Sequence, residues 1–284
     1  SKYLFGNIGY IYVSSFSENA AYEMKAAAEK LQKQGAKSFI VDLQNNTGGY
    51  VSTAQQMISL FPNTTYAYTE ITNSNTGLIK TSNLNYKLPG TSRLLINRYS
   101  ASASEMVAAS LLDQKAAILY GETSYGKGVM QSFYELMDDS ILKITMAEFT
   151  GPNNTKINKV GITPTITTKE DPIFQAHLDA IIEQYPTYKK LNEFTNVATT
   201  KTFDVTFSQS VDAELFKDSI QLIQLGGTAV STSTSINGAV LTVTPSEPLV
   251  KGAHYTLFIH PDNLVSTSKK KLRTGYYLPV SVSK

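Results

Sequence analysis

The spacing of apolar residues changes once along this chain, and the change separates two kinds of fold. Up to about residue 170, short apolar runs alternate with segments in which Ala, Leu and Met recur at helical spacing. Beyond about residue 198, helical spacing largely disappears, and short β-branched and aromatic runs are separated by turn residues. The first pattern indicates an α/β domain with right-handed crossovers, and the second is typical of an all-β sandwich.

Individual segments place the elements of the α/β part. The expected strands are 8–13, 38–43, 94–97, 116–120 and 140–148. The expected helices are 18–34, with Ser17 as its N-cap, 51–60, and a segment that begins near Glu105.

The all-β part is expected to contain strands at 203–207, 219–225, 239–243 and 255–259, with 228–235 as a polar loop. We therefore predict an α/β domain at 1–178, a helix and linker at 179–197, and a β-sandwich at 198–284.

Composition excludes several classes of function. The chain has 25 basic and 23 acidic residues and a net charge of +2, so nothing indicates a nucleic-acid or anionic-membrane partner. No apolar run approaches the roughly 18 residues that span a bilayer. There is no cysteine, which excludes disulfides and thiol nucleophiles, and the three histidines are too scattered for a metal site. We expect neither a metal nor a cofactor.

Two segments of the α/β part carry residues suited to acyl-transfer chemistry. Ser102 lies in a run of small residues, and Lys127 lies between Gly126 and Gly128. All three histidines lie C-terminal of both segments, so a Ser-His-Asp triad is not expected there. A serine activated by a lysine remains as the option for nucleophilic attack on a carbonyl.

A lysine base has requirements that the sequence around Lys127 can meet. Its amine must be desolvated, because an ordinary lysine is almost fully charged at neutral pH. The flanking glycines let neighbouring backbone approach closely. Gln131 can orient the amine without favouring its charged form, but residues four apart on a strand are about 13 Å apart, so a bend is required.

The oxyanion that forms during attack needs two aimed donors. One is expected from the backbone N–H of Ala103, directly after the nucleophile. The second is expected from the glycine turn after the strand 38–43, where Gly48 and Gly49 permit unusual backbone angles.

Each segment also has a plain structural interpretation. A Ser/Ala run before a helix is typical of a helix N-terminus, and Ser102 with Glu105 fits a capping box. A Gly-Lys-Gly sequence alone is typical of a turn with a solvated lysine. The functional interpretation depends on finding the segments together in one domain.

Four blocks of residues resemble the C-terminal processing (tail-specific) peptidases. The blocks are 41–49, 100–105, 121–131 and 159–164. The separation of 25 residues between Ser102 and Lys127 is usual in that family. The resemblance implies Ser102 as nucleophile, Lys127 as general base and Gln131 as its orienting partner. It further implies an oxyanion hole from Ala103 and the glycine turn, with Gly48 preferred to Gly49, and a crotonase-like ββα core shared with ClpP-type peptidases.

The sequence departs from the family pattern at several positions. Gln44 and Thr47 stand in place of the usual Arg and Pro of the glycine-turn block, and Thr165 replaces an acidic residue. Family members also carry a PDZ domain before the core, whereas this sequence starts near the first core strand, so PDZ-based substrate capture is not carried over. The C-terminal part resembles a bacterial Ig-like domain, a module of cell-surface and secreted proteins, through residues 203–211, 241–245 and 248–255.

These observations predict an exported bacterial serine endopeptidase that binds its substrate as an extended strand. A cell-wall or envelope partner of the Ig-like domain is expected, and the sequence leaves the oligomeric state open. The alternative is a catalytically silent envelope protein that holds peptides or wall polymer on the same fold. An acyl-CoA enzyme of the crotonase type has no need for a Ser-Lys pair and is less favoured.

Overall fold

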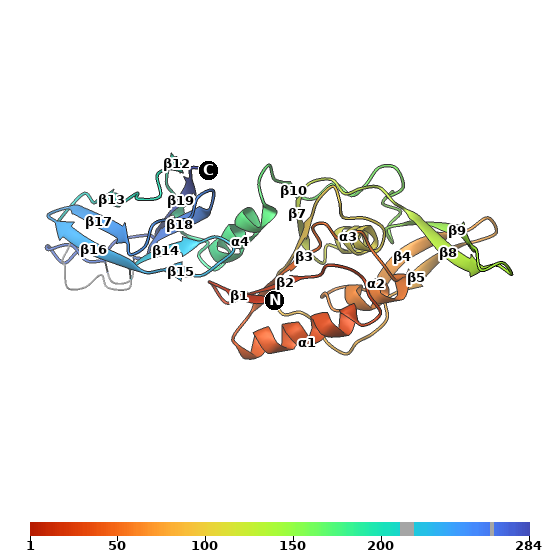
Figure 1. Cartoon of the computed structure of the whole chain (residues 1–284). Helices are drawn as coiled ribbons and strands as arrows, with labels where there is room; N and C mark the ends of the chain where they lie inside the picture. Colours follow the sequence, from red (N-terminus) through yellow and green to blue (C-terminus); the bar gives the residue numbers. More distant parts are fainter. Residues whose placement is uncertain (211–218, 262–263) are drawn as a thin grey trace. The chain divides into compact units, whose positions relative to one another are not determined.

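The computed structural model describes residues 1–210, 219–261 and 264–284. Packing divides the chain into two compact units, residues 1–3 with 7–176 and residues 4–6 with 177–284. The first unit is an α/β domain and the second is all-β apart from one helix, as the sequence predicts (Figure 1).

A six-stranded sheet forms the centre of the first unit, in the order β1-β2-β3-β6-β7-β10. Its neighbouring strands from β2 to β10 are parallel. The strands are β1 (Lys2–Leu4), β2 (Ile8–Tyr12), β3 (Ser38–Asp42), β6 (Ser92–Ile96), β7 (Ile118–Gly121) and β10 (Ile166–Thr167). All residues of β6 are buried, as expected for a central parallel strand covered on both faces.

Three helices pack with this sheet around one apolar core. They are α1 (Ala20–Lys33), α2 (Val51–Ile58) and α3 (Ala103–Asp113). The prediction of Ser17 as the N-cap of α1 is wrong, because the Ser17 carbonyl accepts the Ala20 N–H at 3.1 Å in a turn and Asn19 occupies the cap position.

A second, antiparallel sheet completes this unit, in the order β5-β4-β9-β8. Its strands are β4 (Tyr66–Ile71), β5 (Thr76–Lys80), β8 (Val129–Glu135) and β9 (Ile141–Thr150). Only β9 was predicted. The hairpin β8–β9 turns at 136–140, and β8 is an edge strand whose second edge pairs with no strand in the described part of the chain.

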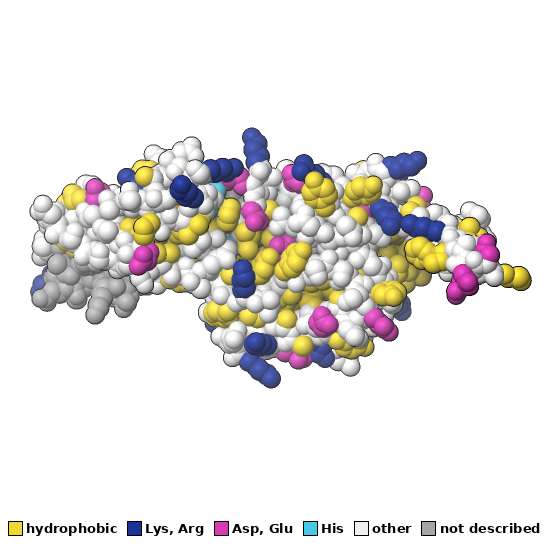
Figure 2. Space-filling model, in the orientation of Figure 1, with side chains coloured by type: hydrophobic (Ala, Val, Ile, Leu, Met, Phe, Trp, Pro, Cys, Tyr) yellow, Lys and Arg dark blue, Asp and Glu magenta, His cyan; other side chains and the backbone are white. Residues whose placement is uncertain are grey.

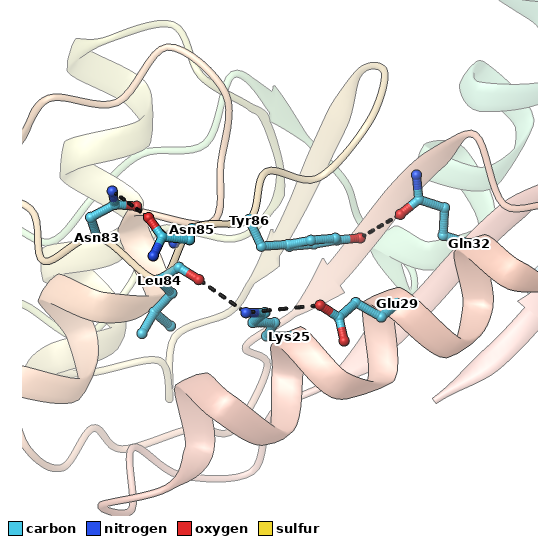
Figure 3. A network of polar contacts seen from close by, with 7 residues as sticks. All are labelled: Lys25, Glu29, Gln32, Asn83, Leu84, Asn85 and Tyr86. Carbon is cyan, nitrogen blue, oxygen red and sulfur yellow. Dashed lines mark hydrogen bonds and ion pairs between the residues drawn. The ribbon is translucent and has the colours of Figure 1, made fainter.

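The segment that joins β5 to β6 is fastened to the surface of α1 (Figure 3). Lys25 Nζ donates to the Leu84 carbonyl at 3.0 Å and lies 3.8 Å from a Glu29 carboxylate oxygen. The Tyr86 hydroxyl donates to Gln32 Oε1 at 3.1 Å. These contacts hold a long connection on the domain that carries the candidate site.

The second unit contains two β-sheets and most of α4 (Pro172–Ile182). One sheet has the order β11-β19-β18-β14-β15, with β12 also paired to β19, and the other has the order β13-β17-β16. The strands are β11 (Lys189–Lys190), β12 (Phe194–Val197), β13 (Phe203–Thr206), β14 (Ile220–Gln224), β15 (Ala229–Val230), β16 (Thr232–Asn237), β17 (Val240–Pro245), β18 (His254–Ile259) and β19 (Tyr276–Val282).

The prediction of a loop at 228–235 is wrong, because this segment supplies β15 and the start of β16. Its Ser and Thr side chains are mostly exposed, so hydrogen bonding to the β17 backbone, not apolar alternation, defines the strand. No described helix is both long and apolar enough to cross a bilayer.

Strand β3 ends in a carboxyl group that is almost wholly buried. Asp42 is 5% exposed, accepts the Tyr10 hydroxyl at Oδ2 (2.7 Å) and accepts the Gln44 N–H at Oδ1 (2.8 Å). The pKa of Asp42 is raised to about 6, chiefly by burial and to a smaller extent by the nearby charge of Asp171, while the two hydrogen bonds partly oppose the rise. The charged form is therefore disfavoured in the folded state.

We predict a pH-dependent gain in stability for Asp42→Asn. A folded-state pKa above the unfolded value near 3.8 gives stability that is present below pH 3.8 and is lost as the pH rises through about 6. The variant cannot ionise at this position. The difference between its free energy of unfolding and that of the wild type should therefore change in its favour by up to about 3 kcal/mol from pH 3.8 to 7. Urea denaturation at a series of pH values measures the difference. A difference in free energy of unfolding that is the same at every pH would contradict the prediction.

Candidate active site

Ser102 occupies a strained turn between β6 and α3. Its φ is 57° and its ψ is −114°, a conformation that residues other than glycine rarely adopt. The turn is held on both sides: the Ala101 N–H donates to the Asn46 carbonyl at 3.0 Å, and the Ser102 N–H donates to Glu105 Oε2 at 2.9 Å. Such a turn presents a side chain at the N-terminus of a helix, where the helix dipole favours developing negative charge.

Glu105 contacts much more than the helix cap that the sequence predicts. Its side chain is fully buried. Besides the Ser102 N–H, it accepts the Ser124 hydroxyl and the Gly126 N–H at Oε1, each at 2.6 Å, and the Lys127 N–H at Oε2 at 2.8 Å. One carboxylate therefore holds the turn of the expected nucleophile and the loop of the expected base.

The glycines beside Lys127 are explained by the close approach of segment 158–161. A Cβ on Gly128 would lie 2.5 Å from the Asn158 nitrogen, and Gly126 has a φ of +94°. The Lys159 N–H donates to the Gly126 carbonyl at 2.8 Å. Two of the sequence blocks, 121–131 and 159–164, thus form one packed unit, as their joint occurrence suggested.

The glycine turn after β3 approaches Ser102 directly, but the expected preference for Gly48 does not fit the structure. The Gly48 N–H donates to Asn46 Oδ1 at 2.9 Å, and Gly48 lines no part of the pocket described below. The N–H groups of Gly49 and Ala103 have no protein acceptor in the described part of the chain. Gly49 and Ala103 both line the pocket described below, so their N–H groups are among those at this site that no described protein acceptor occupies.

Asn46 is a residue of this turn that sequence reasoning gave no role. It is fully buried, its amide donates to the Val13 carbonyl at 2.8 Å, and its own carbonyl accepts from Ala101 and from the Ser104 hydroxyl. Asn46 thereby joins the glycine turn to the nucleophile turn. Only its place between a strand and two glycines could have indicated this.

A pocket of about 210 Å³ collects the sequence-predicted residues. Ser102, Ala103, Gly49, Lys127 and Gln131 all line it. The remaining lining is mainly apolar and consists of Val51, Met106, Val129, Met130 and Phe149, with Thr47, Phe133 and Lys143.

Ser102, Lys127 and Gln131 share this pocket without being hydrogen-bonded to one another. The described part of the chain has no hydrogen bond between Ser102 and Lys127, or between Lys127 and Gln131. The register of β8 on β9 shifts between Met130 and Gln131, where Met146 of β9 is the extra residue, and Gln131 and Lys127 line the same pocket.

Two aromatic side chains that flank Lys127 in the sequence are largely exposed. Tyr125 and Phe133 are 68% and 66% exposed, and Phe133 lines the pocket together with Val129 and Met130. Within the described residues, no group of three or more His, Cys, Asp or Glu side chains is arranged to hold a metal ion. The pocket lining provides a serine on a strained turn, a lysine, backbone N–H groups without described protein acceptors at Gly49 and Ala103, and an apolar wall.

Comparison with known proteins agrees with this arrangement. The chain is 35% identical over 188 residues to the carboxyl-terminal-processing protease of Synechocystis, which covers 62% of this chain and 44% of that protein. It is 35% identical over 194 residues to the carboxy-terminal processing protease CtpA of Bacillus subtilis, covering 67% of this chain and 41% of that protein. The chain thus spans less than half the length of these relatives.

A solved structure shows the same fold. The photosystem II D1 C-terminal processing protease superposes with a TM-score of 0.54 and 25% identity, over 62% of this chain and 46% of that one. A profile of bacterial Ig-like domains matches residues 189–278. The profile of peptidase family S41 matches residues 7–168, more than half of the chain. The chain therefore belongs to peptidase family S41 and carries a bacterial Ig-like domain after its peptidase core.

Proposed function

We propose that this protein is a serine endopeptidase that hydrolyses peptide bonds near the C-terminal tails of protein substrates. The observation that carries the proposal is the single pocket in which the Ser102 hydroxyl, the Lys127 amine and two unbonded N–H groups lie together. The relatives named as carboxyl-terminal-processing proteases support the substrate class.

The chemistry follows from the roles of these groups. Lys127, in its neutral form, takes the proton of Ser102 as Oγ attacks the scissile carbonyl carbon. The oxyanion is bound by the N–H groups of Ala103 and Gly49. The Lys127 ammonium then gives its proton to the leaving amine, and the acyl-enzyme is hydrolysed by water with Lys127 again as base. Gln131 orients the amine without adding a charge.

The substrate binds as an extended strand along the free edge of β8. This strand begins two residues after Lys127, and Val129, Met130 and Gln131 line the pocket. An edge strand offers unpaired N–H and C=O groups to an incoming chain. The small apolar pocket favours small or aliphatic side chains next to the scissile bond.

We place the protein in the bacterial envelope or outside the cell, because an Ig-like module follows the peptidase core. This module is the proposed contact with wall polymer or an envelope partner.

The hairpin β8–β9 of the peptidase unit exposes several large apolar side chains, visible as yellow surface in Figure 2.

The alternative is a catalytically silent peptide-binding protein on the same fold. The observation in its favour is that Ser102 and Lys127 are not hydrogen-bonded in this structure. Sites without substrate are often loosely assembled, so we prefer the peptidase.

Replacement of either member of the proposed dyad should remove turnover. Ser102→Ala and Lys127→Ala should each lower kcat by on the order of 10⁴-fold, and the double variant should be no worse than either single one, because the two groups act as a unit. Cleavage of an unfolded protein with a nonpolar tail, followed by mass spectrometry, measures the loss.

A fluorophosphonate probe separates the two candidate functions. The peptidase should be labelled in the wild type and not in Ser102→Ala. Absence of labelling and of cleavage in the wild type would favour the silent binding protein, and near-native activity of Lys127→Ala would exclude the lysine as base.

Gly48 should tolerate no side chain even though its N–H is not used for the oxyanion. A Cβ there would lie 2.8 Å from both the Ala101 carbonyl oxygen and the Ser102 Cβ, so Gly48→Ala should displace the nucleophile turn and lower kcat by about 10²-fold or more. Gly77→Ala is the matched control, because its Cβ would meet no atom closer than 4.0 Å. Equal activity of the two variants would contradict this account of the turn.

A further inference from the structure

We propose that Glu105 is the positioning residue that sets the nucleophile turn against the loop of the base. The inference rests on the proposed function, because it assigns Glu105 a role in the Ser102–Lys127 reaction. It concerns a group that touches neither substrate nor the reacting atoms and acts through the backbone of both catalytic residues.

A single oxygen atom of Glu105 carries the central part of this argument. Oε2 accepts the Ser102 N–H at 2.9 Å and the Lys127 N–H at 2.8 Å. The Ser102 and Lys127 backbone nitrogens therefore lie within the sum of these two hydrogen-bond distances of each other, although 25 residues separate them in the sequence. No other described side chain bonds to the backbone of both residues.

The second oxygen extends the same clamp. Oε1 accepts the Gly126 N–H and the Ser124 hydroxyl, and Ser124 Oγ in turn accepts the Ile162 N–H at 2.7 Å. Through Ser124, the carboxylate is thus linked to Ile162, which directly follows the segment 158–161 that packs against the flanking glycines. Four donors surround a fully buried group, so the negative charge is satisfied by hydrogen bonds, which charged acceptors make stronger than neutral ones do.

The clamp also determines which N–H groups remain for the oxyanion. Because Glu105 takes the N–H of Ser102, the backbone turns through a left-handed conformation and the next N–H, that of Ala103, is left without a protein acceptor. A neutral side chain of the same shape has only one accepting oxygen and turns an N–H₂ group toward backbone donors. Glu105→Gln should therefore loosen the turn and the loop together.

The test compares Glu105→Gln with two controls in the full chain. Glu105→Gln should lower kcat by about 10²-fold or more while KM changes by less than about threefold, and it should slow fluorophosphonate labelling of Ser102 by a similar factor. Ser124→Ala removes one donor and leaves the Oε2 contacts, so its kcat should fall by less than about fivefold. Glu122→Gln, at an exposed position of the same loop, should match the wild type.

Amide hydrogen exchange in the wild type tests the geometry even where Glu105→Gln does not fold. The Ser102 and Lys127 amides should exchange slowly, and the Gly49 and Ala103 amides, without protein acceptors, should exchange faster. Fast exchange at both Ser102 and Lys127 would overturn the proposal. So would a folded Glu105→Gln variant with lowered Tm but unchanged kcat, because that result describes a structural role alone.

Failure of the proposed function gives a different result. If Ser102→Ala cleaves as well as the wild type, the reaction does not use this dyad, whatever Glu105→Gln does. If Ser102→Ala is inactive and Glu105→Gln retains full kcat, the peptidase assignment stands and the positioning role of Glu105 is excluded.

Discussion

A buried carboxylate between two loops is the constraint on which the geometry of this site depends. Glu105 stands at the start of α3, and its four donors come from both segments that carry the proposed chemistry. A buried charge is stable only when its hydrogen-bonding capacity is filled, so the turn at Ser102 and the loop at Lys127 must be in place together. Because Glu105 needs hydrogen-bond donors from both segments, the two segments should adopt their conformations cooperatively.

Contacts with neighbouring residues, and not the intrinsic backbone preference of serine, hold Ser102 in its strained conformation. Asn46 fixes the glycine turn and accepts from the residue before Ser102, while Gly48 comes so close to Ser102 that only a residue without a side chain fits. Backbone conformations of this kind cost free energy and persist only where surrounding contacts determine them. Here those contacts come from the turn that follows β3, a strand whose residues are mostly buried in the parallel sheet.

The spacing of apolar residues predicted the elements whose formation depends mainly on their own sequence. Strands β2, β3, β6 and β7 and helices α1, α2 and α3 follow from apolar spacing, whereas the short strands β1 and β10 at the sheet edges were not predicted. Ser102 and Lys127 were singled out by the elimination of histidine and cysteine, and their roles stay a prediction. Strands β5 and β8, in which no residue is buried, and β4, whose middle residues are buried without regular alternation, were not predicted, because each depends on pairing with other strands.

The choice between Gly48 and Gly49 could not be made from the sequence for a related reason. Both glycines have positive φ, and they differ in that the Gly48 N–H donates to Asn46 whereas Gly49 lines the pocket. Glu105 shows the same limit: its capping contact spans three residues and was predicted, whereas its contacts with Ser124, Gly126 and Lys127 span about twenty and were not.

The edge strand β8 and the loop of Lys127 are one continuous stretch of backbone, with strand pairing beginning only two residues after the amine. A polypeptide that pairs with this edge removes conformational freedom from the same stretch. Substrate binding and the alignment of the proposed base are then thermodynamically linked. A bound chain that orders β8 also restricts the conformations open to Lys127, so one binding free energy serves both effects. A chain that merely enters the pocket, without pairing along the edge, leaves the amine as loosely held as before. Such a site selects first for substrates whose backbone can pair as an extended strand, and only then for the side chains that fit the pocket.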